Sequence, residues 1–278
     1  MIISDSPNRK PGRRLVIALL TDYAHQDFFV ASLHAVILSI QPEARIVDVS
    51  HDVPSFDVRR GSYLLGACYK YFPEGTIFVA VVDPGVGTKR RLILAETERY
   101  CFIAPDNGVL SGVLSEERPK AVVEIKNSRF FLPCEGRTFD GRDKLAPVAA
   151  WLSSGRKPEE FGPKIRSWKR FPGLGPKMRK GRIAGHIVYI DKFGNCFTDI
   201  PSTRAEEMRK KSGARGLSLT AGGRTAVWSR TYGSGRRGGL LFLPGSQGTI
   251  EIAVKEGSAA ERIGCAAGDP VEIRPLFR

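Results

Sequence analysis

The stretch TIFVAVVDPGVGTKR, residues 76–90, decides the fold of the first half of the chain. Its apolar run, Thr76–Val82, predicts a buried strand that ends on the carboxylate of Asp83. A proline and two glycines then turn the chain before the cation of Arg90. Because ligands bind at the carboxyl ends of strands in open α/β sheets, an acid at this edge is well placed for chemistry. An Asp-Pro turn that only closes a strand predicts the same residues, and the stretch alone does not separate the two interpretations.

Strand and helix patterns alternate on both sides of this stretch. Apolar runs predict strands at residues 14–20, 44–49, 76–82, 92–95, 100–104 and 121–125. Apolar residues at helical spacing predict helices at residues 25–40, 57–71, 107–114 and 144–152. Short strands that alternate with helices are typical of a parallel sheet covered by helices, so we expect a layered α/β domain over residues 14–155.

The second half of the chain has a different pattern. Residues 156–180 are rich in Pro, Gly, Lys and Arg with little periodicity, and we expect them to form an interdomain linker. Beyond them, short apolar runs separated by Gly-rich turns predict an all-β domain, a barrel or a sandwich, over residues 181–278. Residues 1–13 are expected to form a basic tail.

Composition argues against several classes of protein. The chain has 278 residues, of which 42% are hydrophobic and 26% charged, as in an ordinary soluble globular protein. No apolar run approaches the roughly 18 residues that span a bilayer, so we expect no membrane partner and a cytoplasmic location. The net charge of +14 would suit nucleic acid. However, no aromatic-interleaved signature accompanies the basic residues, and we expect a solvated surface and no nucleic-acid partner.

Cysteine and histidine spacing gives no metal signal. The five cysteines are widely spaced and form no Cys-x-x-Cys pair: Cys68, Cys101, Cys134, Cys196 and Cys265. The four histidines are scattered along the chain, so we expect no zinc hydrolase and no bound metal: His25, His34, His51 and His186. His34 lies on an otherwise apolar predicted helix, and we interpret it as a structural or surface residue.

Acidic residues mark the edge at which ligands are expected. Asp22, Asp83 and Asp106 each follow a predicted strand. Asp140 precedes a glycine in a predicted loop at the same edge, whereas Asp143 is most simply an N-cap or first-turn acid of the next helix. The chain contains no EF-hand loop, phosphate-binding loop or nucleophile elbow.

One turn of the second domain, DKFGN at residues 191–195, combines three polar and aromatic groups. Asp191 ends a predicted strand, and the turn then presents the ring of Phe193 and the amide of Asn195. An Asx turn has this composition for structural reasons alone. A carboxylate, a ring and an amide together also suit a zwitterionic amino acid joined to a heterocycle.

A series of short motifs runs in order over nearly the whole chain. They are LTDY (20–23) with Asp27, IVDVSH (46–51), VDPGVGT (82–88), APDNG (104–108), TFDGRD (138–143), DKFGN (191–195), EIA (251–253) and GSA (257–259). On these motifs the chain resembles the S-adenosylmethionine (SAM) hydroxide adenosyltransferase family, which is related to the SAM-dependent fluorinases and chlorinases. The resemblance implies an N-terminal α/β domain and a C-terminal β-barrel-like domain. It also implies a homotrimer that binds its substrate between the N-terminal domain of one subunit and the C-terminal domain of its neighbour.

The resemblance further implies a reaction. Hydrolytic members of the family displace methionine from the 5′ carbon of the ribose with water, giving adenosine and L-methionine, and SAM is the substrate with no cofactor. An Asp, an Arg and a His surround that water. Asp83 and Arg90 match the first two, but Asp140 stands where those enzymes have His.

The halogenating relatives differ from this chain at two of these positions. They carry Tyr at the positions of Asp83 and Asp140, and two carboxylates in their place are expected to repel a halide. Only fifteen residues separate Thr88 from Ala104, so the chain also lacks the extra loop of the fluorinases. Hydrolysis is therefore favoured over halogenation, with Asp140 acting as a base or sharing a proton with Asp83.

The resemblance also implies substrate contacts in both domains. We expect Asp22 to bind the ribose hydroxyls and Phe56 to pack against the nucleoside. Asp191 and Asn195 are expected at the methionine ammonium and carboxylate, with Ser246 assisting. Phe193 and Tyr232 are expected to flank the adenine.

Two other functions remain open at this point. The missing histidine is the reason to consider a non-catalytic sensor of SAM or adenosine as an alternative to the hydrolase. The positive charge alone suggests a nucleic-acid-binding protein.

Overall fold

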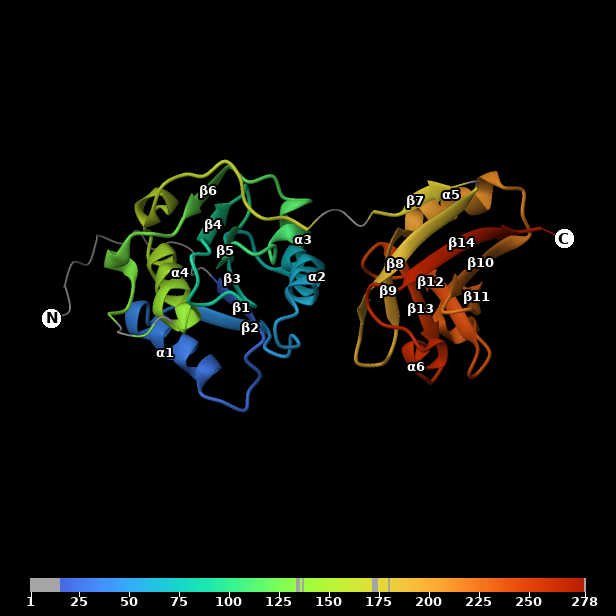
Figure 1. The fold of residues 1–278 in the computed structure, drawn as a ribbon, viewed down its shortest axis with the longest axis horizontal. Coiled ribbons are helices and arrows are strands. Elements are labelled where there is room, and N and C mark those ends of the chain that lie inside the picture. The colour runs from blue at the N-terminus through green and yellow to red at the C-terminus, as the bar shows by residue number, and fades with distance from the viewer. Residues whose placement is uncertain (1–15, 134–135, 137, 172–174, 180, 278) are drawn as a thin grey trace. The chain divides into compact units, whose positions relative to one another are not determined.

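The computed structural model describes residues 16–133, 136, 138–171, 175–179 and 181–277, which form two compact units (Figure 1). The first unit covers Met1–Phe171 and the second covers Pro172–Arg278. The predicted basic tail, residues 1–13, and Cys134 lie outside the described residues. In the part of the chain that is described, no helix is long and apolar enough to cross a membrane.

The first unit is built on a six-stranded sheet with the order β2-β1-β3-β5-β4-β6. Its strands are β1 (Val16–Thr21), β2 (Arg45–Ser50), β3 (Ile77–Val81), β4 (Leu92–Glu96), β5 (Cys101–Pro105) and β6 (Ala121–Glu124). β1, β2, β3 and β5 run parallel, and β4 is antiparallel to both of its neighbours. Residues 97–100 alone join β4 to β5, which is too short for a crossover and reverses the chain. The predicted α/β class is confirmed, with a mixed sheet instead of a parallel one.

Helices cover both faces of this sheet. α1 (Phe29–Ile40) and α4 (Ala146–Ser153) pack on one face, and α2 (Val58–Cys68) and α3 (Ser111–Leu114) pack on the other (Figure 1). Short helical turns extend two of them: η1 (Tyr69–Tyr71) follows α2, and η3 (Gly141–Leu145), a π-helical turn, precedes α4.

The alternation of side chains along the strands divides the core in two. In β1, Ile17 and Leu19 join the core beneath α1 and α4, whereas Ala18 and Leu20 join the core beneath α2 and α3. All four are essentially inaccessible to solvent. The buried runs that predicted strands are therefore apolar on both faces because both faces are covered.

The segment predicted as a linker, residues 156–180, packs in part on the first unit. Pro158–Phe161 forms a short 3-10 helix, η4, and the Phe161 side chain is fully buried in the core beneath α4. The Phe161 carbonyl accepts a hydrogen bond from the amide of Lys126 at 2.9 Å, and the amide of Ile165 donates to the Val122 carbonyl at 2.8 Å. The chain therefore remains part of the first unit as far as residue 171.

The second unit contains a closed β-barrel, which confirms the predicted barrel-like domain. Its ring has the order β14-β10-β11-β12-β13-β9-β8 and closes through pairing of β14 with β8, while β7 (Lys177–Arg179) adds to β8. The ring strands are β8 (Arg182–Ile190), β9 (Cys196–Pro201), β10 (Gly216–Ala221), β11 (Arg224–Trp228), β12 (Leu240–Pro244), β13 (Thr249–Val254) and β14 (Pro270–Leu276). Buried and half-buried residues alternate strictly along β9, as expected for a strand with one face in the barrel core.

Two helices that the sequence analysis did not predict accompany the barrel. They are α5 (Ser202–Lys211) and α6 (Ala259–Ile263). α5 is dominated by charged residues, and its apolar contribution is limited to Ala205 and Met208, three residues apart, which are both buried in the barrel core. This weak apolar signal explains why the helix is difficult to recognise from the sequence.

Removal of the Phe161 ring tests whether the segment after residue 155 belongs to the first unit. We expect Phe161→Ala to destabilise the protein by about 3–5 kcal/mol, because it empties a fully buried aromatic site. Urea denaturation of the full chain, followed by circular dichroism, measures the change. Glu159→Ala in the same short helix is exposed and is the control, with an expected change within about 0.5 kcal/mol. A Phe161→Ala protein as stable as the control would show that the segment is only a linker.

Candidate active site

The carboxyl ends of β1 and β3 bring the first predicted site residues together. Thr21 of β1 pairs with Val81 of β3, so Asp22 and Asp83 leave neighbouring strands at the same edge of the sheet. The strands are rigid and buried, and they fix the position of both carboxylates.

Arg90 lies between two carboxylates. Its Nε donates to Asp83 Oδ2 at 2.6 Å, and its Nη2 contacts the same oxygen and also donates to Asp140 Oδ2 at 2.6 Å. The three side chains are 8%, 6% and 4% exposed for Arg90, Asp83 and Asp140. Burial alone would lower the pKa of Arg90, but the hydrogen bonds to the two carboxylates outweigh it and raise that pKa, so the guanidinium stays charged.

The turn after β3 shapes this cluster. The amide of Gly85 donates to Asp83 Oδ1 at 3.1 Å, and a Cβ at Gly85 would lie 3.0 Å from Cδ of Arg90. Gly87 has φ of +80°, a backbone conformation that favours glycine. The residues of the stretch thus form a tight turn that closes the strand, as the structural interpretation predicts, and they also hold a buried ion pair.

Lys144 completes the charge balance. Its Nζ lies 2.7 Å from Asp140 Oδ1, four residues along the chain. Asp140 does not lie in a loop, as predicted, but at the start of the π-helical turn η3, which brings Lys144 back over it. Two cations therefore offset the charges of Asp83 and Asp140 within the cluster. The i,i+4 spacing of Asp140 and Lys144 could have predicted this ion pair from the sequence.

Tyr23 is a further residue of the site that the sequence analysis did not single out. A Cβ at Gly141 would lie 2.5 Å from the Tyr23 hydroxyl, so this ring approaches the backbone next to Asp140 closely. Burial raises the pKa of Tyr23, and the charges of Asp22, Asp83 and Asp140 raise it further. Tyr23 therefore stays protonated, with a hydroxyl beside the carboxylate cluster. Its presence in the LTDY motif was the only signal.

Asp22 and Phe56 are linked through the backbone. The amide of Phe56 donates to Asp22 Oδ2 at 2.9 Å. Burial raises the pKa of Asp22 in spite of this hydrogen bond, and the nearby charge of Asp83 adds to the effect. Phe56 has φ of +68°, a strained conformation for a bulky residue, and the residue is 69% exposed. Strained residues of this kind gather at binding sites, where the surrounding structure holds them in place.

The other five predicted substrate residues meet in the second unit. They line a single pocket of 930 Å³: Asp191, Phe193, Asn195, Tyr232 and Ser246. Phe193 and Tyr232 are 65% and 46% exposed, so two aromatic residues are accessible at this pocket. One group of predicted residues therefore lies in the first unit, and the other group lies in the second unit.

Asp191 both organises its turn and faces the pocket. Its Oδ1 accepts hydrogen bonds from the amides of Phe193 and Asn195, each at 2.9 Å, and its Oδ2 accepts one from Asn195 Nδ2 at 3.0 Å. These are the bonds of an Asx turn, so the structural interpretation of the turn is correct. The same bonds fix the carboxylate and the amide in one orientation within the pocket.

Glu251 is a buried acid of this pocket with no role in the predicted site. It is 2% exposed and accepts a hydrogen bond from the Tyr232 hydroxyl. Burial raises the pKa of Glu251, the bond from Tyr232 lowers it in part, and Asp191 raises it again. Its place in the EIA motif could have pointed to a functional role, since a charged residue is unusual in an otherwise buried strand.

A separate group of side chains, two histidines and one aspartate, consists of residue types that commonly bind metals. Among the residues that the structure describes, His34, Asp48 and His51 lie close together in the first unit. The histidines are scattered along the sequence, but the fold brings two of them to one carboxylate. None of the three residues belongs to the predicted site.

The pH dependence of the stability of a Glu251 variant tests whether this acid is buried. Folding raises the pKa of Glu251 above its ordinary value of 4.5. The contribution of such an acid to the free energy of unfolding is therefore fully present below pH 4.5, where the group is protonated in both states. This contribution is lost as the pH rises through the raised pKa, because the buried carboxyl then has to ionise. Glu251→Gln cannot ionise, so we expect its stability relative to the wild type to increase from pH 4.5 towards neutral. Urea denaturation at a series of pH values measures this difference.

The control for this experiment lines the same pocket. Glu256 is exposed, and we expect Glu256→Gln to stay within about 0.5 kcal/mol of the wild type throughout the series. A constant or shrinking difference for Glu251→Gln would contradict the assignment of Glu251 as a buried, destabilising charge at neutral pH.

Comparison with known proteins points to one family for both halves of the chain. Two family models match: the SAM hydroxide adenosyltransferase N-terminal domain over residues 17–162 and its C-terminal domain over residues 185–272. The chain is 34% identical to an (R)-S-adenosyl-L-methionine hydrolase of Salinispora arenicola, over 92% of this chain and 97% of that protein. It is also 34% identical to one of Thermus thermophilus, over 92% and 98%.

Other similar proteins extend the comparison. A fluorinase of Nocardia brasiliensis is 27% identical over 95% of this chain and 98% of the relative. The crystal structure of an uncharacterized conserved protein from Thermotoga maritima matches with a TM-score of 0.87 and 35% identity, over 93% of this chain and 99% of that one. With both family models and the full-length relatives in agreement, the chain belongs to the SAM hydroxide adenosyltransferase family.

Proposed function

We propose that this protein is a SAM hydrolase, which converts SAM and water to adenosine and L-methionine. The buried Asp83–Arg90–Asp140 cluster carries the proposal, because it supplies carboxylates fixed at the edge of the sheet where ligands bind. Membership of the family and the names of the relatives support the same activity.

The reaction is a displacement at one carbon. The oxygen of water forms a bond to the ribose 5′ carbon as the bond from that carbon to sulfur breaks, and the electron pair leaves with sulfur as the thioether of methionine. The water loses one proton in the process. Because a sulfonium is already a good leaving group, no acid is needed on that side. The enzyme acts on the water, which is a weak nucleophile without a base or fixed dipoles.

Each residue of the cluster has a part in this scheme. Asp83 and Asp140 provide acceptors for the protons of the attacking water. Arg90 keeps both carboxylates in place, and Lys144 holds the second oxygen of Asp140. Asp140 takes the position that His has in the hydrolytic family pattern. The site needs no cofactor for this chemistry.

Halogenation is the less favoured reaction. A halide would have to compete with two carboxylates for the guanidinium of Arg90, and both already bind it within 2.6 Å. The cluster is therefore better suited to hold water than an anion.

The substrate contacts are proposed from both units. Asp22 binds the ribose hydroxyls, and the exposed residue Phe56 packs against the nucleoside. In the pocket of the second unit, Asp191, Asn195 and Ser246 bind the methionine ammonium and carboxylate, and the rings of Phe193 and Tyr232 flank the adenine. The exposure of both residues supports this last role, because every base can stack on an accessible aromatic ring.

The relatives' names add a stereochemical detail. Two of them are named for the (R) epimer of SAM, and we propose the same preference at the sulfonium of the substrate here. Separate assays of the (R) and (S) epimers therefore belong in any test of activity.

Substitution of Asp83 tests the proposed reaction. We expect Asp83→Asn to lower kcat by about 10²–10⁴-fold, because the amide cannot accept a proton from water. Liquid chromatography with mass spectrometry measures adenosine and methionine formed from each epimer. Glu98→Gln, on a side chain that is 79% exposed, is the control and retains wild-type activity. Absence of adenosine at high concentrations of the wild-type protein with both epimers would end the hydrolase proposal.

A sensor is the second candidate, because Asp140 is shorter than His and is already bound through both oxygens. Calorimetry separates the two functions in the same experiment. Tight SAM binding without turnover by the wild type, together with activity in Asp140→His, would establish a sensor.

We also propose that the protein is a cytoplasmic homotrimer in which each active site combines the first unit of one subunit with the second unit of its neighbour. A mixing experiment tests this arrangement. Asp83→Asn and Asp191→Ala are each expected to be inactive, but subunits exchanged between them should restore roughly a quarter of the sites, as random assortment predicts for a site shared by two chains. Light scattering gives the number of chains. Recovery of no activity after confirmed subunit exchange would place the whole site within one chain.

A further inference from the structure

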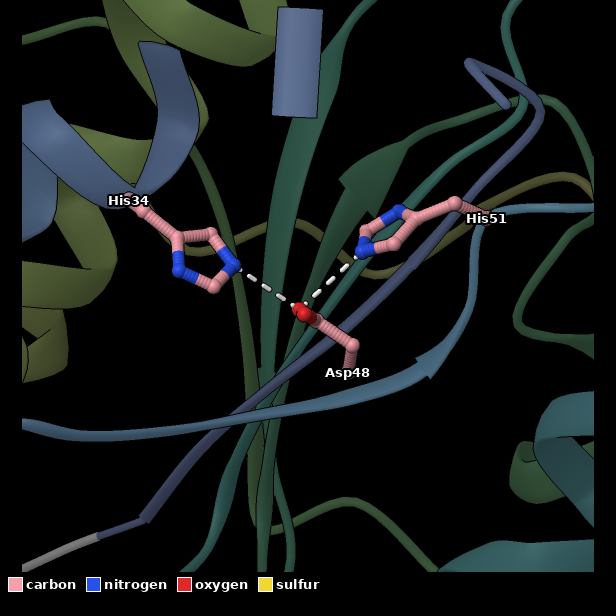
Figure 2. A group of neighbouring side chains, drawn as sticks. All are labelled: His34, Asp48 and His51. Carbon is pink, nitrogen blue, oxygen red and sulfur yellow. Dashed lines mark hydrogen bonds and ion pairs between the residues drawn. The ribbon is translucent and has the colours of Figure 1, made fainter. Parts of the chain in front are cut away.

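Two histidines and an aspartate from three parts of the first unit converge outside the proposed active site. His34 lies on α1, Asp48 on β2, and His51 just after β2. Figure 2 shows both imidazole rings directed at the carboxylate of Asp48. The Nε2 atoms of His34 and His51 lie 2.9 Å and 3.0 Å from Asp48 Oδ1.

We propose that His34, Asp48 and His51 bind a divalent transition-metal ion, with Zn²⁺ as the representative ion. Two imidazole nitrogens and one carboxylate oxygen form a ligand set typical of zinc and of other first-row metals, with the remaining position taken by water. The three ligand atoms lie within 4.8 Å of one another. A tetrahedral zinc ion requires ligand atoms about 3.3–3.5 Å apart, so small movements of the side chains suffice.

His51 is the buried member of the group. It is 1% exposed, and its Nε2 lies 3.0 Å from Asp48 Oδ1. A buried ring nitrogen in this position must either donate a proton to the carboxylate or share a bound ion with it. A metal ion held between Nε2 and Oδ1 is the second of these arrangements.

The other nitrogen of His51 is already held. Nδ1 lies 2.8 Å from Thr21 Oγ1. Histidines that bind metals usually make a hydrogen bond through the second ring nitrogen, which fixes the ring orientation and leaves the first nitrogen free for the metal. The pair of Thr21 and His51 provides this arrangement.

The site is open to an ion from solvent. The side chains of His34 and Asp48 are 32% and 36% exposed, whereas that of His51 is buried. One ligand is therefore fixed in the core, and the two others are free to adjust as an ion enters. The bound ion would join α1 to the end of β2.

A competing arrangement uses protons only. If each histidine donates a proton to Asp48, the same short distances arise without a metal. The two arrangements differ in whether the protein, freed of metals with a chelator, binds an added ion at these residues.

Titration of the metal-free full chain with ZnCl₂ by calorimetry, and with Co²⁺ by visible absorption, tests the proposal. We expect one tight site per chain and a Co²⁺ spectrum of nitrogen and oxygen ligands. His34→Ala and Asp48→Asn should each weaken binding by more than about 100-fold, since even a partner outside the ligand shell accounts for 10–100-fold. His34 and Asp48 are partly exposed, so both variants are expected to fold.

Two control variants exclude other sites. His186→Ala removes a histidine that lies 3.3 Å from a single carboxylate, that of Asp199, and should leave binding unchanged. Cys265→Ser breaks the pair with Cys196, whose sulfur lies 3.6 Å away, and excludes a thiolate site. No tight binding by the wild type, binding that survives His34→Ala and Asp48→Asn, or a Co²⁺ spectrum with thiolate charge transfer would each overturn the proposal.

Discussion

The ion pair of Arg90 with Asp83 and Asp140 is the interaction on which the first unit's site depends. Two carboxylates with almost no exposure to solvent would be strongly unfavourable at neutral pH without a cation between them. Loss of one partner from such a buried pair commonly costs about 3–5 kcal/mol, because the remaining charge is left uncompensated. The local structure follows from this requirement. The glycine turn after β3 lets Arg90 fold back over Asp83, and the π-helical turn before α4 brings Lys144 to Asp140.

The two units present different kinds of chemistry. At the edge of the sheet in the first unit, charged groups are fixed by rigid strands and by each other, which suits positioning of a small nucleophile. In the second unit, a pocket combines two accessible aromatic residues with a fixed carboxylate and amide, which suits recognition of a large, partly charged ligand. The proposed substrate has both a reactive carbon and such groups, so the two chemistries are complementary.

The sequence predicted most of the secondary structure because the strands are short apolar runs bounded by turns. β8 begins and ends as predicted, and the strands of the first unit differ from prediction by at most two residues at either end. The failures have physical causes. α5 has too few apolar residues to show a pattern, and the reversal between β4 and β5 depends on pairing that a run of residues does not reveal. The Pro-rich segment around Phe161 follows no repeating pattern, yet it buries a ring.

The ten residues proposed for the substrate and the reaction were inferred from the short motifs and from the resemblance to the family. Five of them lie in the first unit, and the other five line one pocket of the second unit. Lys144 was missed although its i,i+4 spacing from Asp140 is visible in the sequence. Tyr23 and Glu251 were missed because their roles depend on contacts across the fold. The convergence of His34 and His51 was missed for the same reason, since α1 and β2 are adjacent only after folding.

The packing of Phe161 also has a consequence for synthesis of the chain. Domains generally fold in order as they leave the ribosome. Here all six strands of the first sheet have emerged by residue 124, but the core beneath α4 is not filled until Phe161 arrives. During that interval the partly formed unit exposes the apolar surface that Phe161 later covers. Phe161 is the last residue along the chain to join the core beneath α1 and α4, so we expect this core to close only after the segment around Phe161 has been synthesised.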